Sequence, residues 1–259
     1  MRIAILTIFP EMFESVLGSS ILGRARREKL VEIEPVDIRP FSDRKHKNTD
    51  DYPFGGGAGM VMLAQPICDA VRHLRSQGYT GKCIYMSPRG KTLTQQKVVE
   101  LAQEENFILL CGHYEGVDQR AIDAVVDEEL SLGDFVLTGG EIPAMAVADC
   151  LCRMVPGVLP EESCYTEESH WDGLLEYPQY SRPEEWHGRK VPAVLLSGHH
   201  GNVADWRKKE SYKRTMLRRP DMFAKFDETM LTTKHDRKVL AEAKAEFAAM
   251  QAEADNKAE

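Results

Sequence analysis

The feature that most constrains this chain is the alternation, over its first 155 residues, of short apolar runs with segments of helical periodicity. The apolar runs are RIAILTIF (2–9), VEIEPVDI (31–38), KCIYM (82–86) and FILLC (107–111), and the helical segments are 64–77 and 94–105. Strands that alternate with helices in this way are typical of α/β domains. The sequence therefore predicts an α/β fold with a largely parallel sheet.

Polar loops that contain glycine follow three of the expected strands. SPRG (87–90) follows KCIYM, GHYEGVD (112–118) follows FILLC, and TGGEIPAM (138–145) follows the strand candidate DFVL (134–137). Ligands bind outside the carboxyl ends of the strands in open α/β sheets, so these loops predict one pocket lined by backbone groups. None of them has a phosphate-binding pattern, which favours an adenosine-type ligand without phosphates.

The segment DYPFGGGAGMVM (51–62) places four glycines within five positions. Its spacing fits neither the dinucleotide fingerprint nor a Walker loop, because Met60 stands where the last glycine would be and no Lys-Ser or Lys-Thr follows. A flexible turn is one interpretation. The other is a loop whose bare backbone allows a ligand to approach closely.

Charge excludes one class of function and leaves another open. With 41 acidic and 33 basic side chains the net charge is −8, which disfavours nonspecific binding of polyanions by the whole molecule. The stretch WRKKESYKRTMLRR (206–219) nevertheless holds seven Lys or Arg against one Glu, and Arg207, Arg214 and Arg218 are spaced to share a helical face. This stretch is either a local nucleic-acid contact or an ordinary solvated helix face.

Cysteine usage and the N-terminus favour the cytoplasm. The six cysteines show no C-x-x-C spacing, and the apolar run at 3–9 is too short for a membrane span and lacks a cleavage site. We therefore expect reduced thiols, no membrane association, and neither zinc nor disulfides.

Composition also indicates a domain boundary. After a helix expected to end near Arg153, PGVLPEESCYTEESH (156–170) is acidic and contains Pro, Ser and Thr, as mobile linkers do. We predict a first domain at 1–158, a linker at 159–171 and a second domain at 172–259. In the second domain VPAVLLSG (191–198) is strand-like, and helical patterns run from about 201 to the end.

Eight motifs, in this order, resemble the bacterial tRNA (guanine-N1)-methyltransferase family of the SPOUT superfamily, from Met1 to about residue 225. They are SSILGRA, DDYPFGGGAGMVM, YMSPRGKTLTQ, CGHYEGVD, SLGDFVLTGGEIPAM, RMVPGVLP, ESHWDGLLEYPQYSRP and VPAVLLSGHH. The resemblance implies a trefoil-knotted α/β methyltransferase domain, a small helical tRNA-binding domain, and a homodimer with shared active sites. It also implies methylation of N1 of guanosine 37, beside the anticodon. Rules of chain connection argue against a knot, so the knot rests on the resemblance alone.

The resemblance further implies that the knot loops hold S-adenosyl-L-methionine. The matching positions are Tyr85, Met86, Ser87, Pro88, Gly90, Gly112, Tyr114, Glu115, Gly116, Leu132, Gly133, Asp134, Phe135, Val136, Leu137, Gly139, Gly140 and Pro143. Uncharged backbone groups in these loops suit adenine and ribose, and we expect Glu115 to balance the amine or the sulfonium. A Mg²⁺ requirement known in the family has no recognisable ligand set in this sequence.

Two residues match the family's catalytic positions. Asp172 is the expected general base for the N1 proton, with partial burial raising its pKa, and Arg153 the expected donor to guanine O6. Without the resemblance, Asp172-Gly173 would be a turn and Arg153 a cation at a helix C-terminus. The implied tRNA contacts are Asp50, Gly55, Gly57 and Gly59 around the target base, with Arg207 and Arg214 on phosphates.

Two other functions remain compatible with these motifs. One is a related knotted methyltransferase that acts on another RNA atom, such as a ribose hydroxyl, and would not need Asp172 as a base. The other is a noncatalytic tRNA-binding protein that has kept the fold. Glu176 and Ser181 depart from the residues expected there, Asp and Thr, which affects only the fine geometry near Asp172.

Overall fold

The computed structural model describes residues 1–258 and separates the chain into two compact units. Unit 1 comprises Met1–Glu162 and unit 2 comprises Ser163–Glu259. Residue 259, the last position of the predicted second domain, lies outside the described residues.

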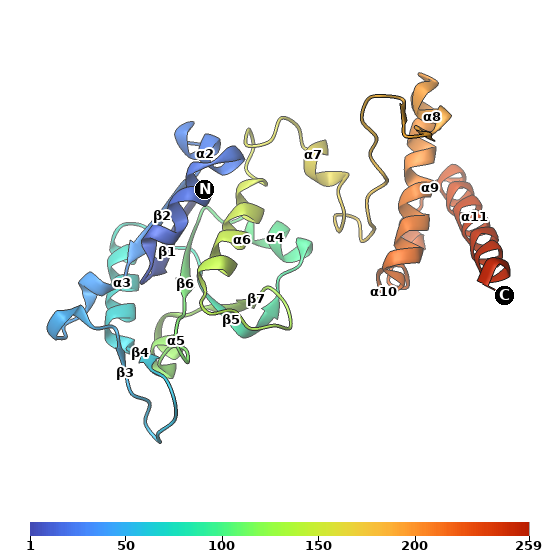
Figure 1. The fold of residues 1–259 in the computed structure, drawn as a ribbon. Helices are drawn as coiled ribbons and strands as arrows, with labels where there is room; N and C mark the ends of the chain where they lie inside the picture. Colours follow the sequence, from blue (N-terminus) through green and yellow to red (C-terminus); the bar gives the residue numbers. More distant parts are fainter. Residues whose placement is uncertain (259) are drawn as a thin grey trace. The chain divides into compact units, whose positions relative to one another are not determined.

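A five-stranded sheet with strand order β2-β1-β6-β5-β7 forms the centre of unit 1 (Figure 1). Its strands are β1 (Arg2–Thr7), β2 (Glu32–Asp37), β5 (Cys83–Thr92), β6 (Asn106–Cys111) and β7 (Glu128–Ser131). Every pairing between neighbours is parallel, so the prediction of an α/β fold with a parallel sheet is confirmed. All four apolar runs are strands, within a residue or two at their ends, except that β5 extends further.

The prediction failed at DFVL, which is not a strand. The strand lies just upstream, at β7, and the side chains of Phe135 and Val136 are 55% and 80% exposed. Their apolar character gave the appearance of a buried strand, but a strand needs a buried face, and these side chains lie on the surface. Residues 87–90 are likewise not a loop but part of β5, whose register with β7 shifts between Met86 and Lys91.

Helices cover both faces of this sheet. On one face α3 (Ala64–Ser76) and α5 (Gln119–Val125) contribute to one apolar cluster. On the other, α1 (Glu14–Gly18), α2 (Ser20–Arg27), α4 (Gln95–Leu101) and α6 (Glu141–Cys152) contribute to a second. The helix expected at 64–77 is confirmed, and the one expected at 94–105 is shorter.

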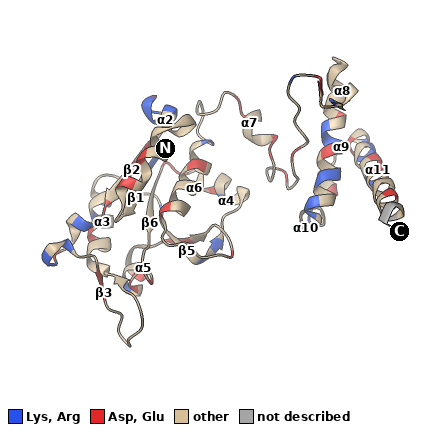
Figure 2. Ribbon diagram, viewed as in Figure 1, with Lys and Arg blue, Asp and Glu red and all other residues tan. Residues whose placement is uncertain are grey.

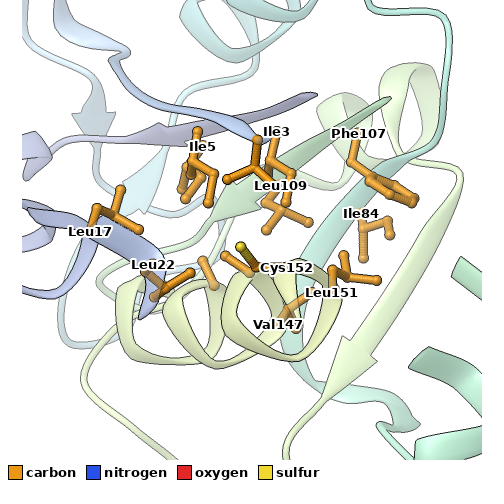
Figure 3. Close-up of a cluster of buried hydrophobic side chains, with 14 of the residues drawn as sticks. Ile3, Ile5, Leu17, Leu22, Ile84, Phe107, Leu109, Val147, Leu151 and Cys152 are labelled. Atoms are coloured by element: carbon orange, nitrogen blue, oxygen red, sulfur yellow. The ribbon is translucent and has the colours of Figure 1, made fainter. Parts of the chain in front are cut away.

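Strand β1 shows why this sheet has two apolar layers. Ile3 and Ile5 face the cluster of α6, and Ala4 and Leu6 face the cluster of α3, because successive side chains of a strand point to opposite faces. In Figure 3, Ile3 and Ile5 lie with Leu109 above α6. Full burial of each isoleucine stabilises the fold by about 1.5–3 kcal/mol. Because helices cover both faces of β1, side chains on both faces are buried, and the sequence of the strand is a continuous apolar run.

The glycine segment forms the tip of a hairpin in unit 1. Strands β3 (Asp50–Asp51) and β4 (Val61–Met62) pair in antiparallel fashion, and the residues between them turn back. Gly55, Gly56, Gly57 and Gly59 all have positive φ, between 79° and 128°, a conformation that side-chain-bearing residues rarely adopt. Short 3₁₀ helices at Pro10–Phe13, Arg39–Phe41 and Lys45–Lys47 complete this unit.

Unit 2 is mainly helical. Its elements are α7 (Ser163–Thr166), the hairpin strands β8 (Glu185–Trp186) and β9 (Arg189–Lys190), α8 (Ala193–Leu196), α9 (His200–Arg218), α10 (Pro220–Phe223), a 3₁₀ helix (Glu228–Met230) and α11 (Lys234–Ala258). VPAVLLSG was expected to be strand-like and instead contains α8, with Leu196 half exposed. Within residues 1–258 no helix combines the length and the apolarity that crossing a bilayer requires.

Candidate active site

The polar loops of unit 1 enclose one cavity of about 350 Å³ at the carboxyl ends of β5, β6 and β7. It is lined by residues 85–89, 112–117, 130–132, 135–140 and 143. The prediction that these segments form one pocket is confirmed. Of the residues matched to the family's cofactor loops, all but Gly90, Gly133 and Asp134 line the cavity.

Glycines allow the backbone segments around this cavity to pack against one another. A Cβ on Gly112 would lie 2.7 Å from the Tyr85 hydroxyl oxygen, and one on Gly140 would lie 2.7 Å from the Cα of Cys111. The Gly140 N–H donates to the Gly112 carbonyl at 2.8 Å, which joins the loop after β6 to the loop before α6. The walls are therefore packed so closely at Gly112 and Gly140 that neither position has room for a side chain.

The glycine hairpin is bonded to this pocket at its base. The Glu115 N–H donates to the Met60 carbonyl at 3.0 Å, and the Met62 N–H donates to the Gly116 carbonyl at 2.9 Å. A Cβ on Gly59 would lie 2.6 Å from the Glu115 side chain, whereas nothing lies within 4 Å of a Cβ on Gly55 or Gly57. The base of the hairpin is thus packed and its tip is open to a large ligand.

Most groups that line the pocket are uncharged. Burial raises the pKa of Tyr85, and burial together with the nearby Asp50 carboxylate raises the pKa of Tyr114, so both hydroxyls are neutral at pH 7. Glu115 contributes an acidic side chain to the lining, and Arg89 is 3.5 Å from the Glu129 carboxylate. Such a pocket suits a neutral or cationic ligand better than a phosphate.

Asp172 lies in unit 2, on the wall of a second cavity of about 290 Å³ that Tyr177, Arg207 and Tyr212 also line. Its Oδ1 accepts the Leu174 N–H at 3.1 Å, and Gly173 has a φ of 82°, so the Asp-Gly pair does form a turn. The expectation that Asp172 is partly buried is wrong, since this residue is exposed. Exposure follows from its place at the tip of a turn.

Burial, with a smaller effect of the Asp172 charge, raises the pKa of the Tyr212 hydroxyl to about 12. This phenol is therefore neutral throughout the physiological range and can serve as a hydrogen-bond donor in the cavity of unit 2.

Arg153 belongs to unit 1, where it caps the C-terminus of α6. Its N–H donates to the Asp149 carbonyl at 3.2 Å, which places the residue in the last turn, as the helix-cation interpretation requires. The two candidate catalytic residues therefore come from different units.

The basic stretch at 206–219, which lies in α9 apart from Arg219, is largely paired with carboxylates of unit 2. Five of its seven cations have a carboxylate within 4.0 Å, in the pairs Arg207–Glu167, Lys208–Asp236, Lys209–Glu246, Lys213–Glu246 and Arg219–Asp221. Among the described residues, Arg214 and Arg218 have no ion pair. Figure 2 shows the basic residues of α9 and the acidic residues of α11. The basic surface is smaller than the sequence indicates.

Sequence reasoning missed several lining residues and found no metal site. Leu130 and Ser131, at the end of β7, line the cavity and precede the loops that were expected to form it, whereas His113 and Thr138 lie inside those loops. Over residues 1–258, no group of three or more His, Cys, Asp or Glu is placed to bind a metal ion. The loop boundaries predicted His113 as a lining residue, whereas its contacts with other segments are visible only in the fold.

The fold and this cavity define an α/β protein with a small-molecule-sized pocket at the carboxyl edge of a parallel sheet. Comparison with known proteins narrows this class. The family model described as tRNA (Guanine-1)-methyltransferase TrmD matches residues 1–225. The chain therefore belongs to the tRNA (guanine-1)-methyltransferase family.

Two relatives named tRNA (guanine-N(1)-)-methyltransferase illustrate the similarity. The protein from Ruminiclostridium cellulolyticum is 56% identical over 227 residues, which cover 87% of this chain and 97% of the relative. The protein from Clostridium beijerinckii is 52% identical over 240 residues, which cover 93% of this chain and 98% of the relative. Similarity thus extends over both units.

Proposed function

We propose that this protein transfers a methyl group from S-adenosyl-L-methionine to N1 of guanosine 37 in tRNA. Family membership supports the reaction, and the observation that carries the cofactor assignment is the cavity built from glycine-rich backbone loops at the sheet edge. In the proposal, unit 1 binds the methyl donor and unit 2 contributes to binding of tRNA. The protein acts in the cytoplasm, where its substrate tRNA is found.

The residues around the cavity fit this cofactor. Backbone N–H and C=O groups can read the adenine edge, and the neutral hydroxyls of Tyr85 and Tyr114 can bond to uncharged groups. Glu115 supplies the negative charge that would balance the amine or the sulfonium. The cofactor supplies the electrophilic methyl group. The close contact of Gly140 with Cys111 is consistent with the knotted arrangement expected for these loops.

Asp172 and Arg153 would act on the guanine. N1 carries a proton and becomes a strong nucleophile as that proton leaves, so Asp172 would accept it. Negative charge then develops on O6, and Arg153 would donate hydrogen bonds there, an interaction stronger in the transition state than in the ground state. Because the two residues belong to different units, a homodimer that shares its active sites would accommodate both. Exposed Phe135, Val136 and Ile142 in and beside the pocket loops support such an assembly.

Two surfaces would contact the tRNA. The open tip of the hairpin, with Gly55 and Gly57 at positive φ, lets a flipped-out base approach bare backbone, with Asp50 at the base of the hairpin. On α9, Arg207 and Arg214 would contact phosphates, and Arg218, four positions after Arg214, is spaced to share their face of the helix. Arg207 also lies 4.7 Å from the Tyr177 ring centroid, so it must exchange this contact for a phosphate.

The test is methyl transfer from labelled S-adenosyl-L-methionine to two tRNA transcripts that differ only in having G or A at position 37. Label on N1 of guanine 37 in the first transcript alone is the expected result. Label on a ribose oxygen would instead identify a related methyltransferase, and tRNA binding without transfer would identify a noncatalytic protein. The assay is run with Mg²⁺ and with EDTA, because no metal ligand set occurs in the described residues.

A further inference from the structure

A buried carboxylate lies directly behind the wall of the cavity in unit 1. Glu141, the first residue of α6, is only 2% exposed and does not line the cavity. One carboxylate oxygen accepts the Thr7 hydroxyl at 2.8 Å, and the other lies 4.0 Å from Nδ1 of His113. Burial of an ionised carboxylate is costly unless the carboxylate is hydrogen-bonded or paired. The neighbours of Glu141 therefore decide whether its burial is tolerated.

His113 presents the complementary feature. Its Nδ1 is buried and has no hydrogen-bond partner among the described residues, and the acidic group that faces it is Glu141. The ring packs edge-on against Phe9 and Tyr114, with centroids 4.9 Å away in both cases, and the residue lines the cavity. A carboxylate beside Nδ1 favours the imidazole form that carries its proton there.

Gly139 completes the cluster between these two side chains. It forms a bridge with His113, and a Cβ at this position would lie 2.7 Å from His113 Nδ1 and would overlap the Glu141 carboxylate. The Thr7 hydroxyl also accepts the Phe9 N–H at 2.9 Å, so the same oxygen fixes the chain just after β1. Glu141 thus contacts three separate segments: the end of β1, the loop after β6 and the loop before α6.

We propose that Glu141 is a positioning residue that fixes His113 and Gly139, and through them two walls of the cofactor cavity. The carboxylate stands at the N-terminus of a 12-residue helix, where the helix dipole favours negative charge. One carboxylate oxygen accepts the Thr7 hydroxyl, and the other places its negative charge 4.0 Å from Nδ1 of His113, beyond hydrogen-bond distance. This inference rests on the proposed function, since the cavity is taken to be the site for S-adenosyl-L-methionine.

The test separates positioning from general stability by means of Glu141→Gln. This variant keeps the size of the side chain and an acceptor for Thr7 but removes the charge that faces His113. We expect the Kd for S-adenosylhomocysteine and the KM for S-adenosyl-L-methionine to rise about tenfold, because the charge that orients the His113 ring is lost from a buried site. The kcat at saturating methyl donor should remain within about twofold, because Glu141 does not line the cavity.

Val98→Ala is the matched control. Val98 is buried on α4 and does not line the cavity, so its truncation should lower the Tm and leave the Kd unchanged. A second pair of variants covers the case in which Glu141→Gln does not fold. Thr7→Ser keeps the hydroxyl and should bind like the wild type, whereas Thr7→Val should weaken binding about threefold.

The outcomes distinguish this inference from the proposed function. If wild-type protein does not bind S-adenosylhomocysteine in calorimetry, the proposed cofactor is wrong. If wild-type protein binds it and Glu141→Gln binds equally well, the positioning role is overturned and Glu141 is merely structural. The role is also overturned if Thr7→Val binds like Thr7→Ser.

Discussion

The two units of this protein are held together in different ways. In unit 1, apolar side chains fill both faces of a parallel sheet, and Phe13, Tyr79 and Phe107 are fully buried. In unit 2, the buried apolar cluster consists of Leu174, Tyr212, Val239, Leu240 and Ala243, and ion pairs connect α9 to α11. The first unit is built to hold a cavity in fixed geometry. The second depends on charges that an RNA could also use.

This difference has an energetic basis. Apolar burial contributes roughly 25 cal/mol per Å² and is not screened by salt, whereas an exposed ion pair contributes about 0–1 kcal/mol and weakens as ionic strength rises. Unit 1 should therefore respond mainly to changes of volume in its core. Unit 2 should respond to pH, salt and the substitution of single charges.

The largest expected effect separates the roles of the units in the reaction. Asp172→Asn should lower the rate of single-turnover methyl transfer about 10³-fold, because loss of a general base removes roughly 10²–10⁴ in rate. The Kd for S-adenosylhomocysteine should not change, since the cofactor cavity lies in unit 1. Glu176→Gln is the control, because Glu176 lines the same cavity as Asp172 and has no proposed role. A rate within threefold of wild type in Asp172→Asn would contradict the mechanism.

Core truncations test the difference in packing. Leu109→Ala, in the sheet of unit 1, should cost about 3–5 kcal/mol, and Leu240→Ala, in the small cluster of unit 2, about 2 kcal/mol. Urea unfolding can follow the units separately, because all three tryptophans, Trp171, Trp186 and Trp206, belong to unit 2. Tryptophan fluorescence should report Leu240→Ala and circular dichroism both variants. Equal costs would remove the distinction between the two cores.

Charge reversal on α9 tests which cations are available to RNA. Arg214→Glu should weaken tRNA binding about tenfold and reduce the slope of log K against log salt by about 1, as loss of a phosphate contact does. Lys208→Gln should have a smaller effect, because its ammonium already lies 2.7 Å from Asp236. If Arg214→Glu binds tRNA like the wild type, the surface of α9 is only solvated.

The smallest expected effect concerns acid. Hydrogen bonds from Lys213 and Lys209 lower the pKa of Glu246 below its ordinary value of 4.5. A carboxyl whose pKa is lowered in the folded state stabilises it above the unfolded pKa, and this contribution is lost as the pH falls through the folded pKa. Because the Glu246 side chain is 42% exposed, the effect should be only about 0.5 kcal/mol.

The measurement is the urea midpoint of the tryptophan signal at pH 7 and pH 3.5. Glu246→Gln should reduce the difference between the two midpoints. An unchanged difference would mean that this pair does not stabilise unit 2.

Local patterns predicted the parts of this structure that local physics decides. The double-sided burial of β1 is visible in its apolar run, and the periodicity of 64–77 gave α3. The prediction of a strand at DFVL was wrong because the apolar side chains of Phe135 and Val136 are exposed and do not belong to a core. The pairing of the α9 cations with carboxylates could not be predicted from the sequence either, because partners such as Lys213 and Glu246 are 33 positions apart. The contact of Thr7 with Glu141 spans 134 positions and has no sequence signature.

The strand order has a consequence for how the chain folds during synthesis. Strand β1 lies between β2 and β6, and Arg2 pairs with Glu32 on one side and with Asn106 on the other. One edge of β1 can therefore be satisfied early, but the other waits until β6 leaves the ribosome. At roughly 5–20 residues per second, the 70 or so residues between β2 and β6 take about 4–14 s to emerge. For that interval one edge of β1 has unpaired backbone N–H and C=O groups, and such an edge can pair with the wrong strand or with another chain.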